Sequence, residues 1–546
     1  MLLLLCTFIL LFPTLLGWGY VFVRDLGSPW KGMSSQIVIG TIIVSYILGF
    51  KALFGPIPLF LNGLILVLGL FAFFSKKVYL QLWNFPRKNA VLLLPFLLLA
   101  LIGGSFYPFI LDHFGYYVPT IKWLNEYGII KGISTIEITL GQYSFWHIFQ
   151  SGFSLFADPF LRINAFFLFI YTLYAIERKQ NILLLFVPIF LFFIQSPSPD
   201  LPTFILALIV VNEIVSGNKK YSILYFLALF AFVCKPTLFW LPLFVFICDS
   251  NRFKRVPNYI LYSFFPLLLL FLKNYSAFGY PIFPVQIGGL GFAWEPNEQL
   301  LRQSSEMALL KTYDMQYSFE EIRAFSAFDY IKNWFLLDGI KRYIHIGYSA
   351  LLIAFCFYSF KFSQNQKSRI YRSLAICLLI KTFFVLVFSA QYRFLLDALF
   401  VMMFCILLQK VKTPKLHYFS AVLSFVVLLF LANPLWIKSL IPSFKLSHFM
   451  TGFSKDQLIK PATFQLNKFK KYTIGNLTFH VVEDYPLSFD TPLPAISPEF
   501  LENYYNAGIF PQMIGESYDE GFISKPLTTE QKNQLSRILS NLKKAD

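Results

Sequence analysis

Long apolar runs separated by short polar breaks dominate the first 434 positions of the chain. The runs are roughly 17 to 23 residues long, which is enough for a helix to cross the hydrocarbon core of a bilayer. They are continuously apolar and do not alternate with polar residues, so membrane-spanning strands are a poor alternative. The pattern predicts about fourteen transmembrane helices, at residues 1–23, 36–54, 57–75, 89–106, 159–176, 181–195, 201–216, 221–234, 236–248, 257–273, 343–360, 370–390, 394–410 and 416–434.

One of these runs is interrupted in its middle. Cys234-Lys235-Pro236 divides the apolar stretch 221–248 into two short halves. Two short crossings and a broken or re-entrant hairpin both fit this pattern, because irregular backbone at membrane depth is tolerated where protein surrounds it.

The composition agrees with a membrane protein. Hydrophobic residues make up 57% of the 546 positions and charged residues only 14%, so soluble domains of ordinary size could not bury this much apolar surface. The fold class is therefore an all-α polytopic membrane protein. The six cysteines fall in or at the ends of apolar runs without CxxC spacing, so neither a disulfide framework nor a zinc site is supported.

Positive charges indicate how the spans are oriented. Short loops on one side of the predicted spans are rich in Lys and Arg, which is typical of the cytoplasmic side. They contain Lys76, Lys77, Arg87, Lys88, Arg178, Lys179, Lys219, Lys220, Arg252, Lys254, Arg255, Lys361, Lys367, Arg369, Arg372, Lys410, Lys412 and Lys415. This asymmetry accounts for most of the net charge of +17, so no nucleic-acid partner is needed to explain it.

The same orientation places the N-terminus and two long loops outside. We divide the chain into N-terminal transmembrane helices at 1–88, a transmembrane core at 89–434 with external loops 107–158 and 274–342, and an external tail at 435–546. The tail is charged and contains an alternating run at 472–482 and a helical pattern near 529–544. It is therefore expected to be a small α+β unit.

Asp112 is the most informative polar residue. It follows an apolar run directly, and an ionised carboxylate at the edge of a bilayer is costly unless it meets water, a cation or a reacting group. We interpret it as a candidate catalytic carboxylate, with a helix cap or a loop ion pair as the alternative. Residues 113–127 and 143–153 read as two amphipathic helices at the membrane surface beside it.

Other polar residues are predicted on the same outer side, although they come from separate segments. An acid there could activate an acceptor hydroxyl, and cations could hold a lipid phosphate. The candidate substrate-binding residues are His113, Tyr116, Asp200, Lys235, Lys273 and Arg393. Each also has a structural interpretation: a buried histidine, an interfacial aromatic, a helix cap, a lysine reaching the interface, a helix end or a polar break.

The first external loop resembles that of GT-C glycosyltransferases, which are integral-membrane enzymes that use polyprenyl-phosphate sugars. The likeness rests on Asp112 after an early span, the two amphipathic stretches, Phe156-Ala157-Asp158 and Arg162-Ile163-Asn164. A closer likeness is to a family of uncharacterised bacterial membrane proteins. It rests on Ser196-Pro197-Ser198-Pro199-Asp200-Leu201-Pro202, Lys273-Asn274-Tyr275, Gly279-Tyr280-Pro281-Ile282-Phe283-Pro284 and Gln391-Tyr392-Arg393-Phe394.

The resemblance implies transfer of a sugar from a polyprenyl-phosphate donor to a hydroxyl of a cell-envelope glycan or lipid, at the outer face of a bacterial inner membrane. Several GT-C enzymes carry two adjacent acids in this loop, whereas Asp112 is followed by His113. No cofactor is therefore required, and a divalent cation stays open without support from paired acids. A lipid or small-molecule transporter and a noncatalytic polysaccharide-assembly protein remain alternatives.

Overall fold

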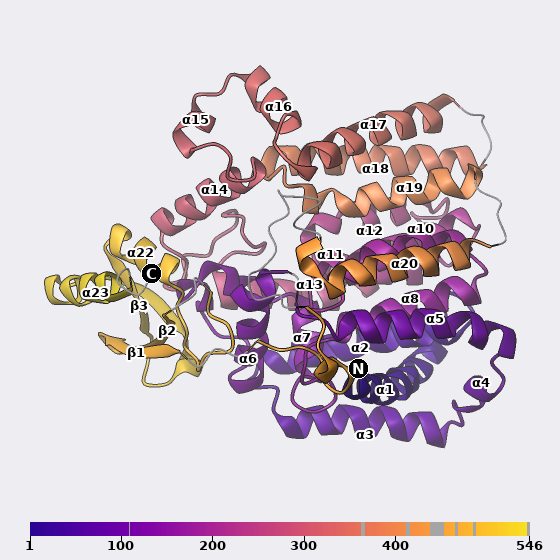
Figure 1. The fold of residues 1–546 in the computed structure, drawn as a ribbon, viewed down its shortest axis with the longest axis horizontal. Helices are drawn as coiled ribbons and strands as arrows, with labels where there is room; N and C mark the ends of the chain where they lie inside the picture. Colours follow the sequence, from indigo (N-terminus) through magenta and orange to yellow (C-terminus); the bar gives the residue numbers. More distant parts are fainter. Residues whose placement is uncertain are drawn as a thin grey trace.

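The computed structural model describes residues 1–108, 110–361, 366–410, 415–436, 452–464, 468–483 and 487–542. Most of these residues are helical, and the long helices lie side by side in one bundle (Figure 1). The bundle contains α1 (Leu2–Leu26), α2 (Met33–Ala52), α3 (Leu59–Ser75), α5 (Arg87–Gly104), α8 (Ile163–Glu177), α10 (Asp200–Val215), α11 (Tyr221–Cys234), α12 (Trp240–Cys248), α13 (Val256–Phe278), α17 (Ile340–Lys361), α18 (Gln366–Phe388), α19 (Leu396–Lys410) and α20 (Leu416–Ala432).

The mostly helical architecture with several candidate membrane spans is confirmed, but the predicted number of about fourteen crossings is not. Each predicted span coincides with a helical segment, and six helices of the described residues are long and apolar enough to cross a membrane. They are α1, α2, α5, α13, α17 and α18. The predicted span at 181–195 is a succession of short turns, η4 (Asn181–Phe186), α9 (Val187–Phe190) and η5 (Leu191–Phe193).

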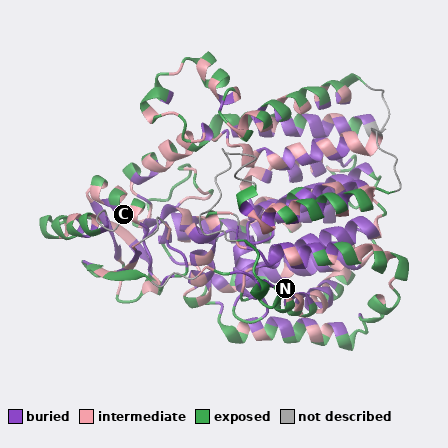
Figure 2. Ribbon diagram, viewed as in Figure 1, coloured by how far each residue is buried: buried purple, intermediate pink, exposed green. Residues whose placement is uncertain are grey.

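The centre of the bundle is formed by α8, α10 and α11. Every residue of α10 is buried, whereas α3, α13, α17 and α20 expose apolar side chains such as Phe71, Phe264, Ile353 and Val422 (Figure 2). An outward-facing apolar surface is what a helix needs where lipid replaces water.

The break at Lys235 ends one helix and starts another. Lys235 itself is extended, with φ −149° and ψ 105°, and the turn η6 (Pro236–Leu238) leads into α12. Pro236 cannot donate a backbone hydrogen bond, so the helix cannot continue through it. Helices α11 and α12 then pack against each other, which makes this segment a broken hairpin.

The first external loop folds into short pieces. These are η1 (His113–Tyr117), a wide helical turn that continues into α6 (Val118–Glu126), then η2 (Ile133–Thr135), η3 (Ile138–Gln142) and α7 (Phe145–Ser151). The expectation of a surface helix at 143–153 is wrong, because all seven residues of α7 are buried. Helix α6 is buried on one face and leaves Glu126 exposed. Helix α7 packs against α2, with Phe145 on Tyr46 at 5.7 Å between ring centroids.

The second external loop lies beside the start of α17, and Trp334 Nε1 in this loop donates to Ala390 O at 2.8 Å (Figure 1). It contains α14 (Glu298–Thr312), α15 (Phe319–Arg323) and α16 (Ala327–Phe335). Capping boxes start both α15 and α16, at Ser318 and Ser326. The two caps therefore start two separate helices.

The tail is the small α+β unit that the sequence predicts. It contains the antiparallel pair β1 (Phe469–Ile474) and β2 (Leu477–Val482), the antiparallel pair β3 (Ile509–Met513) and β4 (Phe522–Pro526), α22 (Pro498–Ala507) and α23 (Thr529–Leu542). The tail packs on the first external loop, since the N–H of Phe522 donates to Lys131 O and the N–H of Phe489 donates to Phe114 O, both at 2.9 Å.

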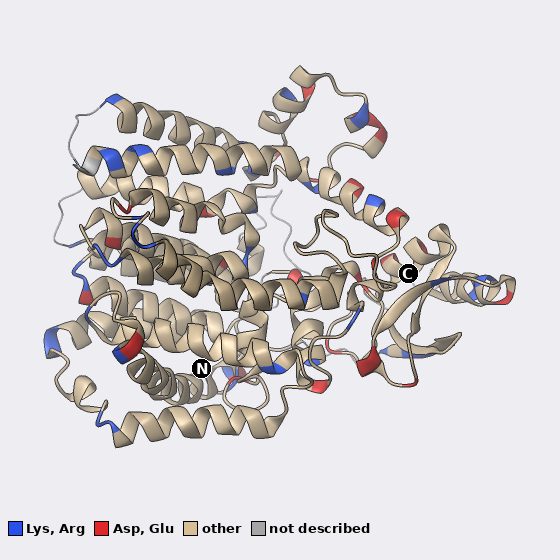
Figure 3. Ribbon diagram, turned by 180° about the vertical axis from the view of Figure 1, so that it is seen from behind, with Lys and Arg blue, Asp and Glu red and all other residues tan. Residues whose placement is uncertain are grey.

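The N-terminus and the tail lie at the same end of the bundle. The N-terminal ammonium donates to Gln457 O at 2.6 Å, and the N–H of Leu3 donates to Ile459 O at 2.9 Å. Several Lys and Arg lie at the opposite end (Figure 3). This arrangement is the one that the loop charges predict, with the tail and the basic loops on different sides. A short helix, α4 (Leu80–Trp83), also lies in one of the basic loops.

Candidate functional site

Asp112 forms an ion pair with Arg393 at the tail end of the bundle. Arg393 Nη1 lies 3.0 Å from Asp112 Oδ2, although the two residues are 281 positions apart. Both side chains are about one-third exposed, at 34% for Arg393 and 31% for Asp112. Burial alone would lower the pKa of Arg393, but the carboxylates of Asp112 and Asp200 raise it well above the usual value. Arg393 is therefore a permanent cation here.

A second ion pair joins Asp200 to Lys235. Asp200 is the first residue of α10, Lys235 follows α11, and both side chains are more than nine-tenths buried. Lys235 Nζ donates to Asp200 Oδ1. Asp200 does not cap its own helix through its side chain, because Ser198 Oγ accepts the N–H of Asp200 at 3.2 Å. The polar run before α10 thus leaves this carboxylate free for the lysine.

The two pairs form one cluster. The positive charge of the Arg393 guanidinium also attracts the Asp200 carboxylate. Arg393 and Lys235 both approach the ring of Phe394, at 5.5 Å and 5.2 Å from its centroid. A cation near an aromatic face is stabilised by the ring quadrupole, so Phe394 holds the two positive charges near each other. We call these five residues the charged cluster.

Buried rings line one side of the charged cluster. Tyr116 and Tyr117 are buried, and the Tyr117 hydroxyl donates to Ser198 Oγ at 3.4 Å. Burial, and then the charge of Asp112, raises the pKa of Tyr116, so its hydroxyl stays protonated. His147 packs on Tyr117 with 4.8 Å between ring centroids. Burial and the charge of Lys273 lower the pKa of His147 to about 3, so this imidazole is neutral.

His113 and Lys273 are placed differently from the other candidates. Burial and the neighbouring charge of Arg162 lower the pKa of His113 well below its usual value, and its Nδ1 is buried without a hydrogen-bond partner in the described chain. Lys273, near the end of α13, is buried and donates to Gln142 O at 2.8 Å. Among the described residues, Lys273 makes no ion pair with the charged cluster.

Among the described residues, ion pairs that the sequence does not predict include Lys381–Asp397 and Lys341–Asp314. Lys381 and Asp397 are both buried and in contact, and Trp240 Nε1 donates to Asp397 Oδ2 at 2.7 Å. Lys341 of α17 pairs with Asp314 and lies 5.4 Å from the ring of Tyr392. The signal for the first pair was a charged residue inside each of two apolar runs, which is a functional hint in itself.

The charged cluster does not suit a divalent cation. Within the part of the chain that the structure describes, no three His, Cys, Asp or Glu residues come together as metal ligands. Both carboxylates of the cluster are already matched by Arg393 and Lys235. A dication would have to compete with two fixed cations, so we derive no metal-dependent step.

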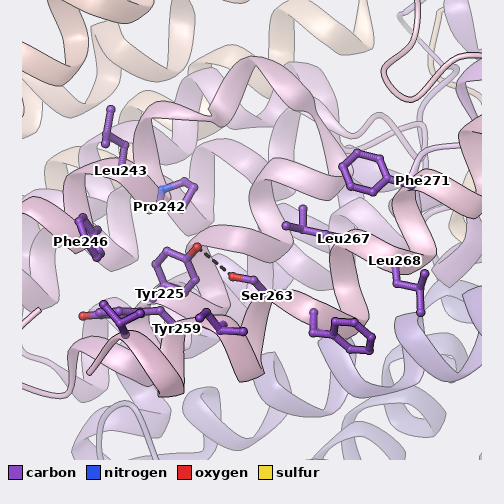
Figure 4. A pocket seen from close by; sticks show the side chains of 12 residues that line it. Tyr225, Pro242, Leu243, Phe246, Tyr259, Ser263, Leu267, Leu268 and Phe271 are labelled. Atoms are coloured by element: carbon purple, nitrogen blue, oxygen red, sulfur yellow. Dashed lines mark hydrogen bonds between the residues drawn. The ribbon is translucent and has the colours of Figure 1, made fainter. Parts of the chain in front are cut away.

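An apolar groove opens on the membrane-facing flank. Residues of α11, α12 and α13 line a space of about 700 Å³ (Figure 4). Its lining is aliphatic and aromatic apart from the hydroxyls of Tyr225, Tyr259 and Ser263. The Tyr225 and Ser263 hydroxyls share a hydrogen bond of 3.0 Å. The groove contains none of the residues of the charged cluster. Its lining includes Phe271, two positions before Lys273.

The helix bundle, its apolar outer surface and the polar tail end together define a multi-pass helical membrane protein. The model of a family described as a domain of unknown function (DUF8201) matches residues 1–400, so the chain belongs to that family. The match contains the whole charged cluster and ends before the tail. Comparisons with curated proteins and with solved structures gave no match.

Proposed function

We propose that the protein is a membrane glycosyltransferase that moves a sugar from a polyprenyl-phosphate donor to an acceptor hydroxyl at the tail side of the membrane. The observation that carries this proposal is the convergence of two acids and two cations from four separate segments. Asp112, Asp200, Lys235 and Arg393 meet at one end of the bundle, and Asp112 and Arg393 remain partly exposed.

In this mechanism Asp112 is the general base. Its carboxylate takes the proton from the acceptor hydroxyl, whose oxygen attacks the anomeric carbon while the bond to the phosphate oxygen breaks. Arg393 and Lys235 stabilise the charge that develops on the departing lipid phosphate. Because Arg393 already holds Asp112, a phosphate that draws the guanidinium away would also free the carboxylate to accept a proton.

The apolar groove supports a lipid-linked donor. A prenyl chain needs a long apolar surface that is open to the bilayer, and the space between α12 and α13 offers one on the flank of the bundle (Figure 4). Placed there, the chain would run along α13 towards the tail end. The inner-membrane location and the cell-envelope acceptor remain part of this proposal.

Replacement of Asp112 by Asn tests the proposal. The variant keeps the size of the side chain but removes the base, so we expect sugar transfer in membrane vesicles supplied with polyprenyl-phosphate sugars to fall by at least about 100-fold. Asp112 suits this test better than Lys235, because removal of one partner of a buried ion pair costs about 3–5 kcal/mol and would affect folding.

Asp25→Asn is the matched control. Asp25 also pairs with an arginine, Arg24, but it is exposed and lies at the end of α1. Transfer should be unchanged in this variant. Full activity in Asp112→Asn protein that inserts normally would refute the proposed mechanism.

A transporter is the second candidate, and the buried Lys381–Asp397 pair favours it. Charged pairs inside apolar helices commonly mark substrate or proton paths. If vesicles containing the protein move a polyprenyl-phosphate sugar across the membrane without forming a glycosylated product, transport replaces transfer as the function.

A further inference from the structure

A second pocket lies at the end of the bundle away from the tail. It has a volume of about 300 Å³ and lies between the end of α1 and the starts of α11 and α13. Its lining residues are Leu26, Gly27, Ser28, Lys219, Lys220, Tyr221, Ser222, Ile223, Arg255 and Tyr262. We call this space the basic pocket. Its volume is at the low end of small-ligand sites, which suits a headgroup better than a large substrate.

The charge of the basic pocket is positive. Lys219, Lys220 and Arg255 line it, and no described Asp or Glu does. Arg255 is matched by Asp249, with Nη1 2.9 Å from Oδ1. Lys220 Nζ donates to Ser28 O at 2.7 Å, which fixes the ammonium at the pocket wall and consumes only one of its three donors. Two lysine charges are therefore left without a carboxylate among the described residues.

The backbone adds donors to the same space. Helix α11 begins at Tyr221, and its N-cap residue Lys220 makes no side-chain cap. The first N–H groups of a helix have no partner within the helix, and they carry the positive end of its dipole. Tyr221 and Ser222 of this first turn line the pocket. An anion there would meet both the lysines and these amides.

Tyr221 adds a further donor beside the pocket. The residue is only 8% exposed, and its ring lies 5.9 Å from the Arg255 guanidinium. Its hydroxyl forms no hydrogen bond within the described chain, and solvent still reaches it, since it is not one of the fully buried unpaired atoms. A phosphate in the pocket would supply an acceptor for this donor.

We propose that the basic pocket binds the phosphate of an anionic phospholipid in the leaflet away from the tail. The position at helix ends places the phosphate at headgroup depth, and Leu26, Ile223 and Tyr262 offer apolar contacts to the first part of an acyl chain. The pocket is remote from the charged cluster, so this proposal does not depend on the proposed transfer reaction.

Lipid retention tests the proposal with the full-length protein. Nanodiscs of phosphatidylcholine with one-fifth phosphatidylglycerol are dissolved in mild detergent, and the lipids that remain on the protein are counted by native mass spectrometry. We expect phosphatidylglycerol to be enriched on the unchanged protein. Removal of each lysine should lower the enrichment about fivefold, so K219A/K220A should abolish most of it.

K76A/K77A is the matched control. Lys76 and Lys77 form another lysine pair in a loop on the basic side, but they do not line the pocket. This variant should keep the enrichment. An equal loss in both double variants would show general attraction to anionic lipid and would overturn a defined site.

Y221F separates binding from folding. The substitution removes only the hydroxyl, and we expect it to lower phosphatidylglycerol enrichment about fivefold. Competition by inorganic phosphate distinguishes the source of the anion. If millimolar phosphate displaces phosphatidylglycerol, or if phosphate binds while the lipid is not enriched, the pocket is a free-phosphate site and the lipid assignment is wrong. Unchanged enrichment in both K219A/K220A and Y221F would also refute the proposal.

Discussion

Glu137 is buried between the first external loop and the tail, and it joins the two. Its Oε1 accepts from the N–H and the hydroxyl of Ser497, both at 2.6 Å, and from the Ser488 hydroxyl at 3.0 Å. Burial raises the pKa of Glu137 from 4.5 to about 7, although the hydroxyl and amide donors oppose this shift. The nearby charge of Glu499 adds to the rise. The protonated form is therefore favoured when the tail is docked.

Docking of the tail should weaken as the pH rises. The pKa of Glu137 is higher in the folded state than in the unfolded state. Its favourable contribution to docking of the tail is therefore complete below about pH 4.5 and is lost as the pH passes through about 7. The free energy that Glu137 contributes to docking at low pH and loses at high pH is about 3 kcal/mol. We expect hydrogen exchange of α22 amides to show less protection at pH 8.5 than at pH 6, after correction for the intrinsic exchange rate.

Glu137→Gln should remove this dependence, because the amide stays neutral at every pH. Glu499→Gln, on the exposed first turn of α22, is the matched control and should keep most of the dependence. A pH profile that is identical in the unchanged protein and in Glu137→Gln would show that another group controls docking.

The charged cluster shows what could be learned from residues alone. The sequence singled out Asp112, Asp200, Lys235 and Arg393 because each is a charge at the edge of an apolar run. It did not show that Asp112 pairs with Arg393 and Asp200 with Lys235, since pairing depends on how α10, α11 and α19 pack. Lys273 was selected by the same argument but is held by the Gln142 carbonyl.

At the scale of elements, α1 and α2 approach each other through glycines. A Cβ at Gly19 would lie 1.7 Å from Gln36 O, and one at Gly40 would lie 2.2 Å from Leu15 O. In a bilayer the hydrophobic effect does not drive helices together, so close packing matters more. Small residues allow it because they let two helix backbones approach each other. The helices were predictable from apolar length, but this choice of neighbours was not.

Gly19→Ala should therefore destabilise the protein by about 1–3 kcal/mol, because an added methyl group forces the two backbones apart. The melting temperature of the detergent-solubilised protein should fall. Gly63→Ala is the control in the neighbouring α3, since a Cβ there meets nothing within 4 Å. Its melting temperature should stay equal or rise slightly. Equal effects of the two substitutions would contradict close packing at Gly19.

At the scale of the whole molecule, the tail and the basic loops lie at opposite ends of the bundle. The N-terminus contacts the segment around Ile459, and α23 belongs to the same end (Figure 1). Lys219, Lys220 and Lys254 lie in the short loops of the other end. One end of the bundle therefore has the charged cluster and the tail, and the other end has the basic pocket.

Cysteine labelling tests this orientation in intact cells. In a background with Cys6→Ala, we expect Asn533→Cys in α23 to react with a membrane-impermeant maleimide added outside. Lys254→Cys should react only after permeabilisation, because basic loops stay in the cytoplasm. Labelling of Lys254→Cys from outside would reverse the topology and move the charged cluster to the cytoplasmic face.

The sequence by itself determined the helical membrane class, the positions of the helical segments and the α+β character of the tail. These properties follow from local patterns, because apolar length, alternation and loop charge act within a few residues. Only the tertiary structure decided that α7 is buried, that the tail is held by Glu137, and which charges become partners. Asp112 and Arg393 are 281 positions apart, so the packing of helices far apart in the chain creates their contact and no local pattern specifies it.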